Sequence, residues 1–432
     1  MLHQPKHIDR RWMIGGTILA MASAACGRSA QSMTSGDIHR FDPRKFGAKG
    51  DGITDDAPAF QRAINAAAEA GGGIVTFGAG EYLLRYRPSE DGDGLSALTL
   101  RSGVIFEGMR RDRCILRLAD KQMGPGTYAR ILASKGDIQD VALRRFTIDG
   151  NRQGQGAYRD DLSGAAVLLG WKGHCKRITV EELSVHDAIG QGIMLQGSID
   201  NLSQNLQIAN NTVERCSYIG IQSSQFNGLV IAGNTVNDCH DNGIDIYGDD
   251  TTGHSTTTTS GNAIIRNNKV NRCNVGIFLE TVSDIVAESN IVIGCRSAGI
   301  RINRIHGEPR NLIIAQNQIA DTQAGIAMGG ETGGVIIRNN VIRGFTAAAI
   351  AFEYNVSNVT AVNNSFMPST RNTPIIFGRP TVENATPPQR LLHIRIERNR
   401  IPARHTAAKI FDNHYSTLVD VNVGQFSATS AD

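Results

Sequence analysis

The sequence predicts an all-β fold, a right-handed parallel β-helix in which short strands wind into stacked coils. Asparagines recur 22 to 35 residues apart in runs of the type Asn-x-(Val/Ile/Phe), and a strand of the type Gly-Ile-x-Φ-x (Φ is apolar or small) follows after eight or nine residues. Glycine is abundant at 47 residues and aromatic residues are scarce at 6%, as expected where tight turns separate short aliphatic strands. The recurring asparagines are Asn211, Asn234, Asn268, Asn290, Asn317, Asn340, Asn364 and Asn399.

Each repeat contains three short strands, as in Leu229–Ala232, Asn234–Val236 and Gly243–Tyr247. A period of about 20 to 50 residues indicates stacked units that pack on their neighbours. We therefore expect a solenoid of about ten coils over roughly residues 100–402. The asparagines should form a ladder inside one turn, each amide bonded to the next. A leucine-rich repeat would need a leucine consensus, which is absent.

Ahead of the coils, residues 54–70 predict a helix that covers the open end of the solenoid. Thr54 or Asp55 can cap its first turn, where Pro58 is tolerated. Apolar residues at i, i+4, i+7 and i+8 from Phe60 give the helix one apolar face. A run of three glycines then ends it.

The first 26 residues predict an export signal. Arg10 and Arg11 precede an apolar stretch, Trp12–Ala25, and this arrangement resembles a Tat signal. An apolar stretch of about 14 residues is too short to span a bilayer. Cleavage after Ala22–Ala24 and lipid attachment at Cys26 are both open. We expect an exported protein, periplasmic or extracellular, with no transmembrane segment after signal removal.

The chain is expected to divide into an export signal (1–26), a polar linker (27–40) and one β-helix domain (41–432). Its formal net charge is +3, of which the first 25 residues contribute +2 (three basic residues against one acidic), leaving +1. A basic balance therefore gives no reason to expect a nucleic-acid partner. The sequence leaves the oligomeric state open.

Four cysteines hold one position in consecutive coils, five residues after an asparagine. In later coils Thr322 and Phe345 take this position, and an exchange between Cys, Thr and Phe indicates an interior stack of free thiols. Neither a CxxC pair nor another metal-ligand spacing occurs. We expect no cofactor; a Ca²⁺ requirement stays open, although no ligand motif supports it. The four cysteines are Cys216, Cys239, Cys273 and Cys295.

Three coils are longer than the minimum, through insertions at Gly248–Gly261, Arg304–Arg310 and Gly378–Gln389. All three follow the Gly-Ile-x-Φ-x strand, so they should lie along one edge of the solenoid. In repeat proteins, loops gathered on one face usually mark the binding face. The substrate-binding residues expected from these loops are Asp249, Arg304 and His306.

The outward positions of the Gly-Ile-x-Φ-x strands should form two columns, because side chains alternate faces along a strand. Polar and ionisable side chains gather in the middle coils of these columns. The candidate catalytic residues are Asp245, Glu280 and Arg301. The candidate substrate-binding residues on the strands are Gln196, Gln222, Tyr247, Phe278 and Asn303.

The expected spacing of these residues suits sugar chemistry. Asp245 and Glu280 lie one coil and two residues apart, which corresponds to about 8 Å between their Cα atoms. Inverting glycosidases separate their two carboxyl groups by about 6.5–9.5 Å. Arg301 should lie about 10 Å from Asp245 in the same column. Phe278 between them offers an apolar platform for a sugar ring.

We expect a polysaccharide partner, with a uronate-containing chain as one option. In the first reading the protein is a lyase: Arg301 acts beside a uronate carboxylate, and Tyr247 or His306 moves protons. In the second, Asp245 and Glu280 are the acid and base of an inverting hydrolase. In the third, the β-helix binds glycans or serves as an envelope structure without catalysis. The alternative without a functional site is a solvated sheet face on which Arg301 merely pairs with Glu280.

The run Phe46–Asp56, together with Ala63–Ala67, Gly71–Gly73 and Gly78–Tyr82, resembles the N-terminal segment of the pectate-lyase-like superfamily. That superfamily includes lyases, hydrolases, epimerases and phage tailspikes. Over residues 41–260 the layout is most similar to bacterial mannuronan C5-epimerases. The resemblance implies a right-handed parallel β-helix that acts on or binds polysaccharides.

The catalytic motif of those epimerases is replaced in this chain. They use a Tyr-Gly-Phe-Asp-Pro-His type motif, and the matching tyrosine, aspartate and histidine are here Gln191, Met194 and Gln196. The family's catalytic arginine falls near Asp241 or Asn242. The polygalacturonase pattern of paired aspartates with Gly-His-Gly is also not met. The resemblance therefore implies the fold, whereas the epimerase machinery does not carry over.

Overall fold

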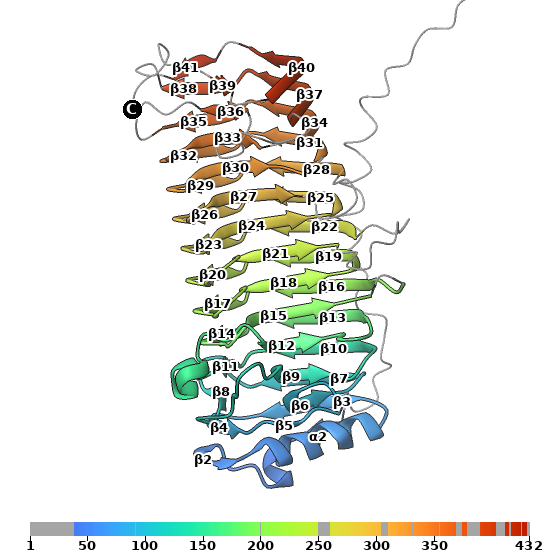
Figure 1. Cartoon of the computed structure of the whole chain (residues 1–432). Coiled ribbons are helices and arrows are strands. Elements are labelled where there is room, and N and C mark those ends of the chain that lie inside the picture. Colours follow the sequence, from blue (N-terminus) through green and yellow to red (C-terminus); the bar gives the residue numbers. More distant parts are fainter. Residues whose placement is uncertain are drawn as a thin grey trace, which may run out of the picture. The chain divides into compact units, whose positions relative to one another are not determined.

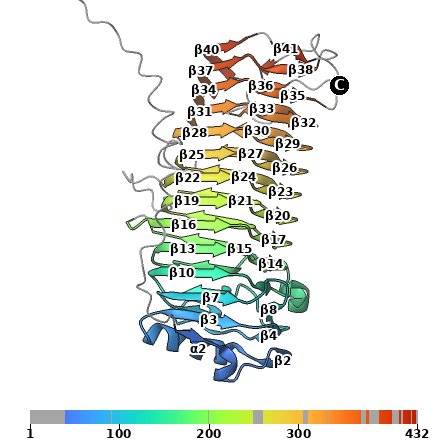
Figure 2. The ribbon, with the colours of Figure 1, turned by 180° about the vertical axis from the view of Figure 1, so that it is seen from behind.

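The computed structural model describes residues 39–429, apart from 91, 199, 249–259, 304–309, 331, 354, 369–373, 378–388, 403–410, 414–415 and 425. The expected export signal with Cys26 and most of the expected linker lie outside the described residues, as do most of the three expected insertions. Arg40–Asp432 forms one compact unit. Strands of three sheets recur in turn along this unit (Figures 1 and 2).

The first sheet has 14 strands, and its neighbours are successive coils of the chain. Its strands are β1 (Arg40–Phe41), β3 (Gly73–Phe77), β7 (Val104–Gly108), β10 (Ile138–Arg144), β13 (Cys175–Glu181), β16 (Ser203–Ala209), β19 (Phe226–Ala232), β22 (Gly261–Arg266), β25 (Ser283–Glu288), β28 (Arg310–Ala315), β31 (Gly333–Arg338), β34 (Val356–Val362), β37 (Gln389–Glu397) and β40 (Ser416–Val423).

The second sheet also has 14 strands, most of them only three residues long. Its strands are β2 (Asp51–Asp55), β4 (Gly80–Leu84), β8 (Cys114–Leu118), β11 (Thr147–Asp149), β14 (Ser184–His186), β17 (Thr212–Glu214), β20 (Thr235–Asn237), β23 (Lys269–Asn271), β26 (Ile291–Ile293), β29 (Gln318–Ala320), β32 (Val341–Arg343), β35 (Ser365–Met367), β38 (Arg400–Pro402) and β41 (Ser427–Thr429).

The third sheet has 13 strands and contains the Gly-Ile-x-Φ-x segments. Its strands are β5 (Arg87–Pro88), β6 (Leu95–Leu100), β9 (Ala129–Ser134), β12 (Gly164–Leu169), β15 (Gln191–Gln196), β18 (Ile221–Ser224), β21 (Ile244–Tyr247), β24 (Val275–Glu280), β27 (Ala298–Asn303), β30 (Ala324–Met328), β33 (Ala348–Phe352), β36 (Ile375–Phe377) and β39 (Phe411–Asn413). Only β5 pairs antiparallel, with β6, among the described strand pairs.

These sheets confirm the parallel β-helix, and the solenoid is longer than the asparagine repeat predicts. The first sheet runs from β1 to β40, whereas the repeat predicted about ten coils. Coils before Asn211 and after Asn399 lack the ladder asparagine, so the repeat marks only part of the solenoid. Buried apolar side chains from all three sheets form one continuous core, as stacked repeats require.

The predicted capping helix exists, but it begins later than expected. It is α2 (Ala57–Glu69), and Phe60 packs its ring edge-on against Phe77 and Tyr82. Thr54 and Asp55, which were expected to start it, belong to β2 instead. Figure 1 shows α2 beside the first coils, at the blue end of the chain.

The reason for this late start is local. Strand β2 pairs with β4, and the Asp51 side chain holds the backbone N–H and hydroxyl of Thr54. The Asp56 carboxylate accepts hydrogen bonds from the backbone N–H groups of Lys49 and Gly50, so it caps no helical N–H.

Two short 3₁₀ helices, η2 (Pro43–Phe46) and η3 (Arg152–Tyr158), complete the described helices. None of the described helices is long and apolar enough to cross a membrane.

The asparagine ladder is continuous over all eight predicted positions. Asn290 is typical: its backbone N–H and its side-chain amide both donate to Oδ1 of Asn317, at 3.0 Å each. Its side chain also donates to the carbonyl of Ile265 at 2.9 Å. Every ladder asparagine is at most 1% exposed. The ladder thus satisfies buried backbone groups that the turn leaves without strand partners.

The interior cysteine stack also matches the prediction. All six described cysteines are free and buried, including Cys216, Cys239, Cys273 and Cys295. Thr322 and Phe345, which continue the stack, are buried as well. Burial raises the pKa of the Cys295 thiol to about 12, so this thiol is chemically inert at neutral pH.

Removing one ladder amide should destabilise the solenoid strongly. Asn290→Ala leaves N–H groups of Asn268 and the Ile265 carbonyl without their partner. We expect the free energy of unfolding to fall by about 2–4 kcal/mol, measured by urea titration. Asn271→Ala is the matched control, because its side chain bonds Asn237 on the half-buried outer face. A similar loss in both variants would contradict a structural role for the ladder.

Candidate functional site

The two predicted columns lie on the outer face of the third sheet. Strand register pairs the residues of the first column in order, from β15 to β27: Met194, Gln222, Asp245, Phe278 and Arg301. The second column follows the same strands: Gln196, Ser224, Tyr247, Glu280 and Asn303. The alternate residues Ile244 and Ile246 are fully buried in the core, so the alternation predicted from the sequence is correct.

Asp245 is the most unusual residue of the first column, because it is a carboxyl that is only 4% exposed. Its Oδ2 accepts a hydrogen bond from the side chain of Asn242 at 2.9 Å. Its Oδ1 is buried without a hydrogen-bond partner among the described residues. A buried carboxyl with one such oxygen is rare in native structures, where buried polar atoms are normally satisfied.

The surroundings of Asp245 favour its protonated form. Burial raises the pKa of this carboxyl to about 7, and the negative charges of Glu280 and Asp241 add to the rise. The hydrogen bond from Asn242 opposes it. A side chain that titrates near neutral pH beside a second carboxylate is a candidate for proton transfer.

Asp245, Glu280, Asp241, Asn242 and Tyr218 form what we call the acid cluster. Tyr218 and Asp241 enter successive strands of the third sheet, where the Asp241 backbone N–H donates to the Tyr218 carbonyl at 3.1 Å. Burial raises the pKa of Tyr218, and the three carboxylates of the cluster raise it further. The cluster thus joins three acidic groups and one phenol on one part of the sheet face.

Sequence reasoning found only part of this cluster. Asp241 and Asn242 were noted only as the place of a missing arginine, and Tyr218 was not considered. All three lie three or four residues before Gln222 of β18 or Asp245 of β21. Extending the columns into the turn that enters each strand would have found them.

The predicted stripe of Asp245, Phe278 and Arg301 is present in strand register. The guanidinium of Arg301, however, already forms an ion pair. Arg301 Nη2 lies 2.5 Å from Glu353 Oε2, and both side chains are less than a fifth exposed. Glu353 comes from the turn after β33, two strands further along the sheet. Arg301 therefore reaches away from Asp245 and pairs with Glu353, whereas the non-functional alternative expected a pair with Glu280.

The remaining predicted binding residues divide into two groups. Gln222 is buried and accepts a hydrogen bond from the Gln191 side chain at 3.3 Å, while Gln196, Tyr247, Phe278 and Asn303 are half-buried on the same face. The loop residues lie outside the described part of the chain: Asp249, Arg304 and His306.

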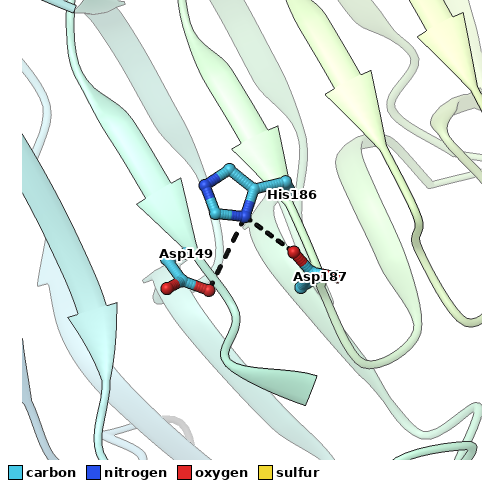
Figure 3. A group of neighbouring side chains, drawn as sticks. All are labelled: Asp149, His186 and Asp187. Atoms are coloured by element: carbon cyan, nitrogen blue, oxygen red, sulfur yellow. Dashed lines mark hydrogen bonds and ion pairs between the residues drawn. The ribbon is translucent and has the colours of Figure 1, made fainter. Parts of the chain in front are cut away.

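A second group of titratable side chains lies on the second sheet, away from the columns. Asp149, His186 and Asp187 offer ligand atoms within 4.8 Å of one another (Figure 3). His186 Nδ1 lies 2.9 Å from Asp187 Oδ2 and 3.7 Å from Asp149 Oδ1. Arg215 bonds the Asp187 carboxylate through two nitrogens, at 2.8 and 3.0 Å. A guanidinium already neutralises this carboxylate, so the arrangement fits an ion-pair network better than a metal site.

Two family models match the chain. The right-handed β-helix region matches residues 171–257 and 250–366, and the pectate-lyase-like model of rhamnogalacturonase A and epimerases matches residues 42–87. These matches cover the middle coils and the capped N-terminal end. The chain is therefore a right-handed parallel β-helix, whose N-terminal residues 42–87 match a pectate-lyase-like model.

Two relatives from Azotobacter vinelandii are similar over about a third of the chain. Mannuronan C5-epimerase AlgE4 is 32% identical over 152 residues, which is 35% of this chain and 27% of the epimerase. Alginate lyase 7 is 33% identical over 147 residues, which is 34% of this chain and 17% of the lyase. The chain thus matches well under two thirds of the length of these relatives.

Solved structures extend the likeness of the fold to nearly the whole chain. The A-module of mannuronan C5-epimerase AlgE4 superposes with a TM-score of 0.68 at 18% identity, covering 89% of this chain and 100% of the module. An exopolygalacturonase from Thermotoga maritima gives a TM-score of 0.60 at 14% identity, covering 84% of this chain and 91% of that enzyme. At such identities the likeness shows the fold and leaves the chemistry to the site.

The raised pKa of Asp245 predicts a pH-dependent stability. The folded protein holds a proton on this carboxyl up to a pH of about 7, whereas the unfolded chain releases it near pH 4. The contribution of Asp245 to stability is therefore full below pH 4 and is lost as the pH rises through 7. Asp245→Asn should remove this dependence, so the variant gains stability relative to the parent between pH 4 and 7. The measurement is the free energy of unfolding from urea titrations at several pH values. The same pH dependence in the variant and the parent would contradict the assignment.

Proposed function

We propose that this protein binds a polysaccharide on the outer face of the third sheet and hydrolyses it with inversion. Asp245 is the general acid and Glu280 is the general base. The observation that carries the proposal is the buried Asp245 carboxyl, whose pKa is raised to about 7 one strand away from a second carboxylate. Such a pair of carboxyl groups with different environments is the arrangement that glycoside hydrolysis requires.

The register supports inversion. Asp245 pairs with Phe278, and Glu280 follows Phe278 by two residues. The two Cα atoms are then about 8 Å apart, which leaves room for a water between a sugar and the base. Asp245 gives its proton to the glycosidic oxygen as the bond to the anomeric carbon breaks. Glu280 takes a proton from the water that attacks this carbon from the opposite side.

The neighbours of Asp245 orient its proton. Asn242 donates to Oδ2, so the proton resides on Oδ1, the oxygen without a described partner. Because Asp245 is 4% exposed, a sugar reaches Oδ1 only when the groups that cover this carboxyl move. The same cover keeps water from the carboxyl and maintains its raised pKa.

The charges of the face favour an uncharged substrate. Asp241, Asp245 and Glu280 are acidic, and Arg301, the cation of the described columns, is already paired with Glu353. A polyuronate brings a carboxylate on every sugar, and at the acid cluster these would meet the like charges of Asp241 and Glu280. A neutral glycan avoids this cost. An exported location, as the N-terminal segment predicts, would place the protein beside such polymers.

β-Elimination is the second candidate, and the similarity to alginate lyase 7 favours it. A lyase must neutralise a uronate carboxylate and move a proton from the neighbouring carbon. Arg301 could serve the first role only after leaving Glu353, and Tyr218 or Tyr247 the second. The two reactions differ in product, since elimination creates an unsaturated end that absorbs ultraviolet light and hydrolysis does not. Binding without either product would identify a non-catalytic glycan-binding protein.

Removing either carboxyl should abolish hydrolysis. We expect Asp245→Asn and Glu280→Gln each to lower kcat by about 10²–10⁴-fold, the usual contribution of a general acid or base, with little change in sugar binding. The measurement is release of reducing ends from a panel of neutral and acidic polysaccharides. Glu288→Gln, on the first sheet, is the matched control and should retain full activity. If hydrolysis persists in both variants, Asp245 is not the general acid and Glu280 is not the general base.

The pH profile should identify Asp245 as the acid. A general acid acts only in its protonated form, and the pKa of Asp245 is raised to about 7. We expect kcat/KM to fall as the pH rises through about 7, and this descending limb should be absent from the residual activity of Asp245→Asn. A limb that persists in the variant would assign the acid to another group.

A further inference from the structure

A column of apolar side chains lies on the outer face of the first sheet. Strand register places one β-branched residue of this column on each of the successive strands β19, β22, β25, β28 and β31 (Figure 1). Ala263 and Ile265 are buried in the core, so Ile264 between them points outward, and the other members occupy the same register position. Ile336 is 42% exposed and the other four are half-buried. We call these residues the apolar column: Val230, Ile264, Val286, Ile313 and Ile336.

The apolar column is bounded by polar residues at both ends. Gln207 precedes the column in strand register and Thr360 follows it. Thr179 and Arg395 occupy the same position one coil further out. Strands favour β-branched residues in general, and threonine meets that preference on an exposed face, so strand propensity does not explain the run of valine and isoleucine. A contiguous apolar patch with a polar rim, here about 19 Å long over four strand spacings, is typical of a protein–protein interface.

Two opposite charges flank the middle of the apolar column. Arg266 on β22 and Glu288 on β25 are register partners, each two residues after a member of the column. Their side chains therefore share the outer face with it, and both are half-buried. In the part of the chain that the structure describes, no ion pair joins these two side chains to each other or to a third residue. The small side chains of Ala232 and Ala315 lie on either side of them in register, so the two charges can meet groups from outside the chain.

We propose that the apolar column is the interface of a homodimer, in which the first sheets of two copies pack face to face. Sheets that pack in this way lie about 10 Å apart. A two-fold axis parallel to the strands, midway between β22 and β25, sets Ile264 of one copy opposite Val286 of the other. The same axis sets Val230 opposite Ile313. Apolar residues thus meet apolar residues along the centre of the interface and are removed from water.

Charge complementarity selects this axis. It brings Arg266 of each copy opposite Glu288 of the other, so two ion pairs form across the interface. On the opposite flank it sets Asn262 across from Asp284 of the second copy, an amide beside a carboxylate. An axis through β25 itself would place Glu288 opposite Glu288 of the second copy, and like charges repel. A face with opposite charges at equal distances from a two-fold axis is complementary to itself, as an isologous interface requires.

The proposed interface is independent of the proposed function. It uses the outer face of the first sheet, whereas the acid cluster lies on the third sheet. The dimer therefore stands or falls without reference to hydrolysis. Its tests measure association alone.

The mass of the full chain in solution tests the dimer directly. We expect light scattering to show a rise to twice the chain mass with increasing concentration, with a Kd on the order of micromolar for a patch of this length. Ile313→Asp should raise Kd at least about tenfold, because each copy would bury an unpaired carboxylate. Ile291→Asp, at a half-buried outward position of β26 in the second sheet, is the matched control and should leave Kd unchanged. A monomer at every concentration, an assembly other than a dimer, or equal loss in both variants would overturn the proposal.

Exchange of the flanking charges tests the axis and does not depend on Ile313→Asp being folded. Arg266→Glu and Glu288→Arg should each raise Kd about tenfold or more, because like charges then meet twice across the interface. An equimolar mixture of the two variants should regain the affinity of the parent, since every charged contact between the two different chains again joins an acid with a base. A defect confined to one chain cannot be repaired by mixing. Single variants that dimerise like the parent, or a mixture that stays as weak as its components, would refute this interface.

Discussion

The structure depends on a ladder of buried side-chain amides. Each ladder asparagine before Asn399 donates to the next one and to a backbone carbonyl of the preceding coil. A turn that repeats in every coil would otherwise bury backbone groups without partners, at about 1–3 kcal/mol each. Because the ladder is one residue wide, it also keeps successive coils in register. The strands that follow each asparagine therefore place equivalent residues directly above one another.

That register turns short sequence segments into columns on the outer surface. In other outward columns, a carboxylate on one coil forms an ion pair with an arginine on the next coil, as in Asp238 with Arg272 and Asp140 with Arg177. Asp245 differs, since the groups described around it are an amide, a phenol and other carboxylates. Burial, with the charges of Glu280 and Asp241, thus raises the pKa of Asp245, whereas the ion pairs of the other columns neutralise charge. The same geometry that stabilises the surface elsewhere creates a titratable site here.

The fold and the chemistry have separate origins in this protein. The β-helix is shared with a mannuronan C-5 epimerase module and an exopolygalacturonase that are each under 20% identical to this chain, so the fold alone does not identify a reaction. The residues that replace the epimerase motif include Met194, which packs with Ala165 and Leu168 in a small apolar cluster.

The sequence by itself determined everything that follows from periodicity: the β-helix, the asparagine ladder, the cysteine stack and the two columns with Asp245 and Glu280. Only the tertiary structure decided which groups meet across coils. In the structure, Arg301 forms an ion pair with Glu353, Tyr218 lies near the carboxylates of the acid cluster, and the ring of Trp171 packs against that of Tyr128. The reason is physical. A repeat specifies where each Cα lies, whereas long side chains and loops can reach several partners, and local packing and charge select among them.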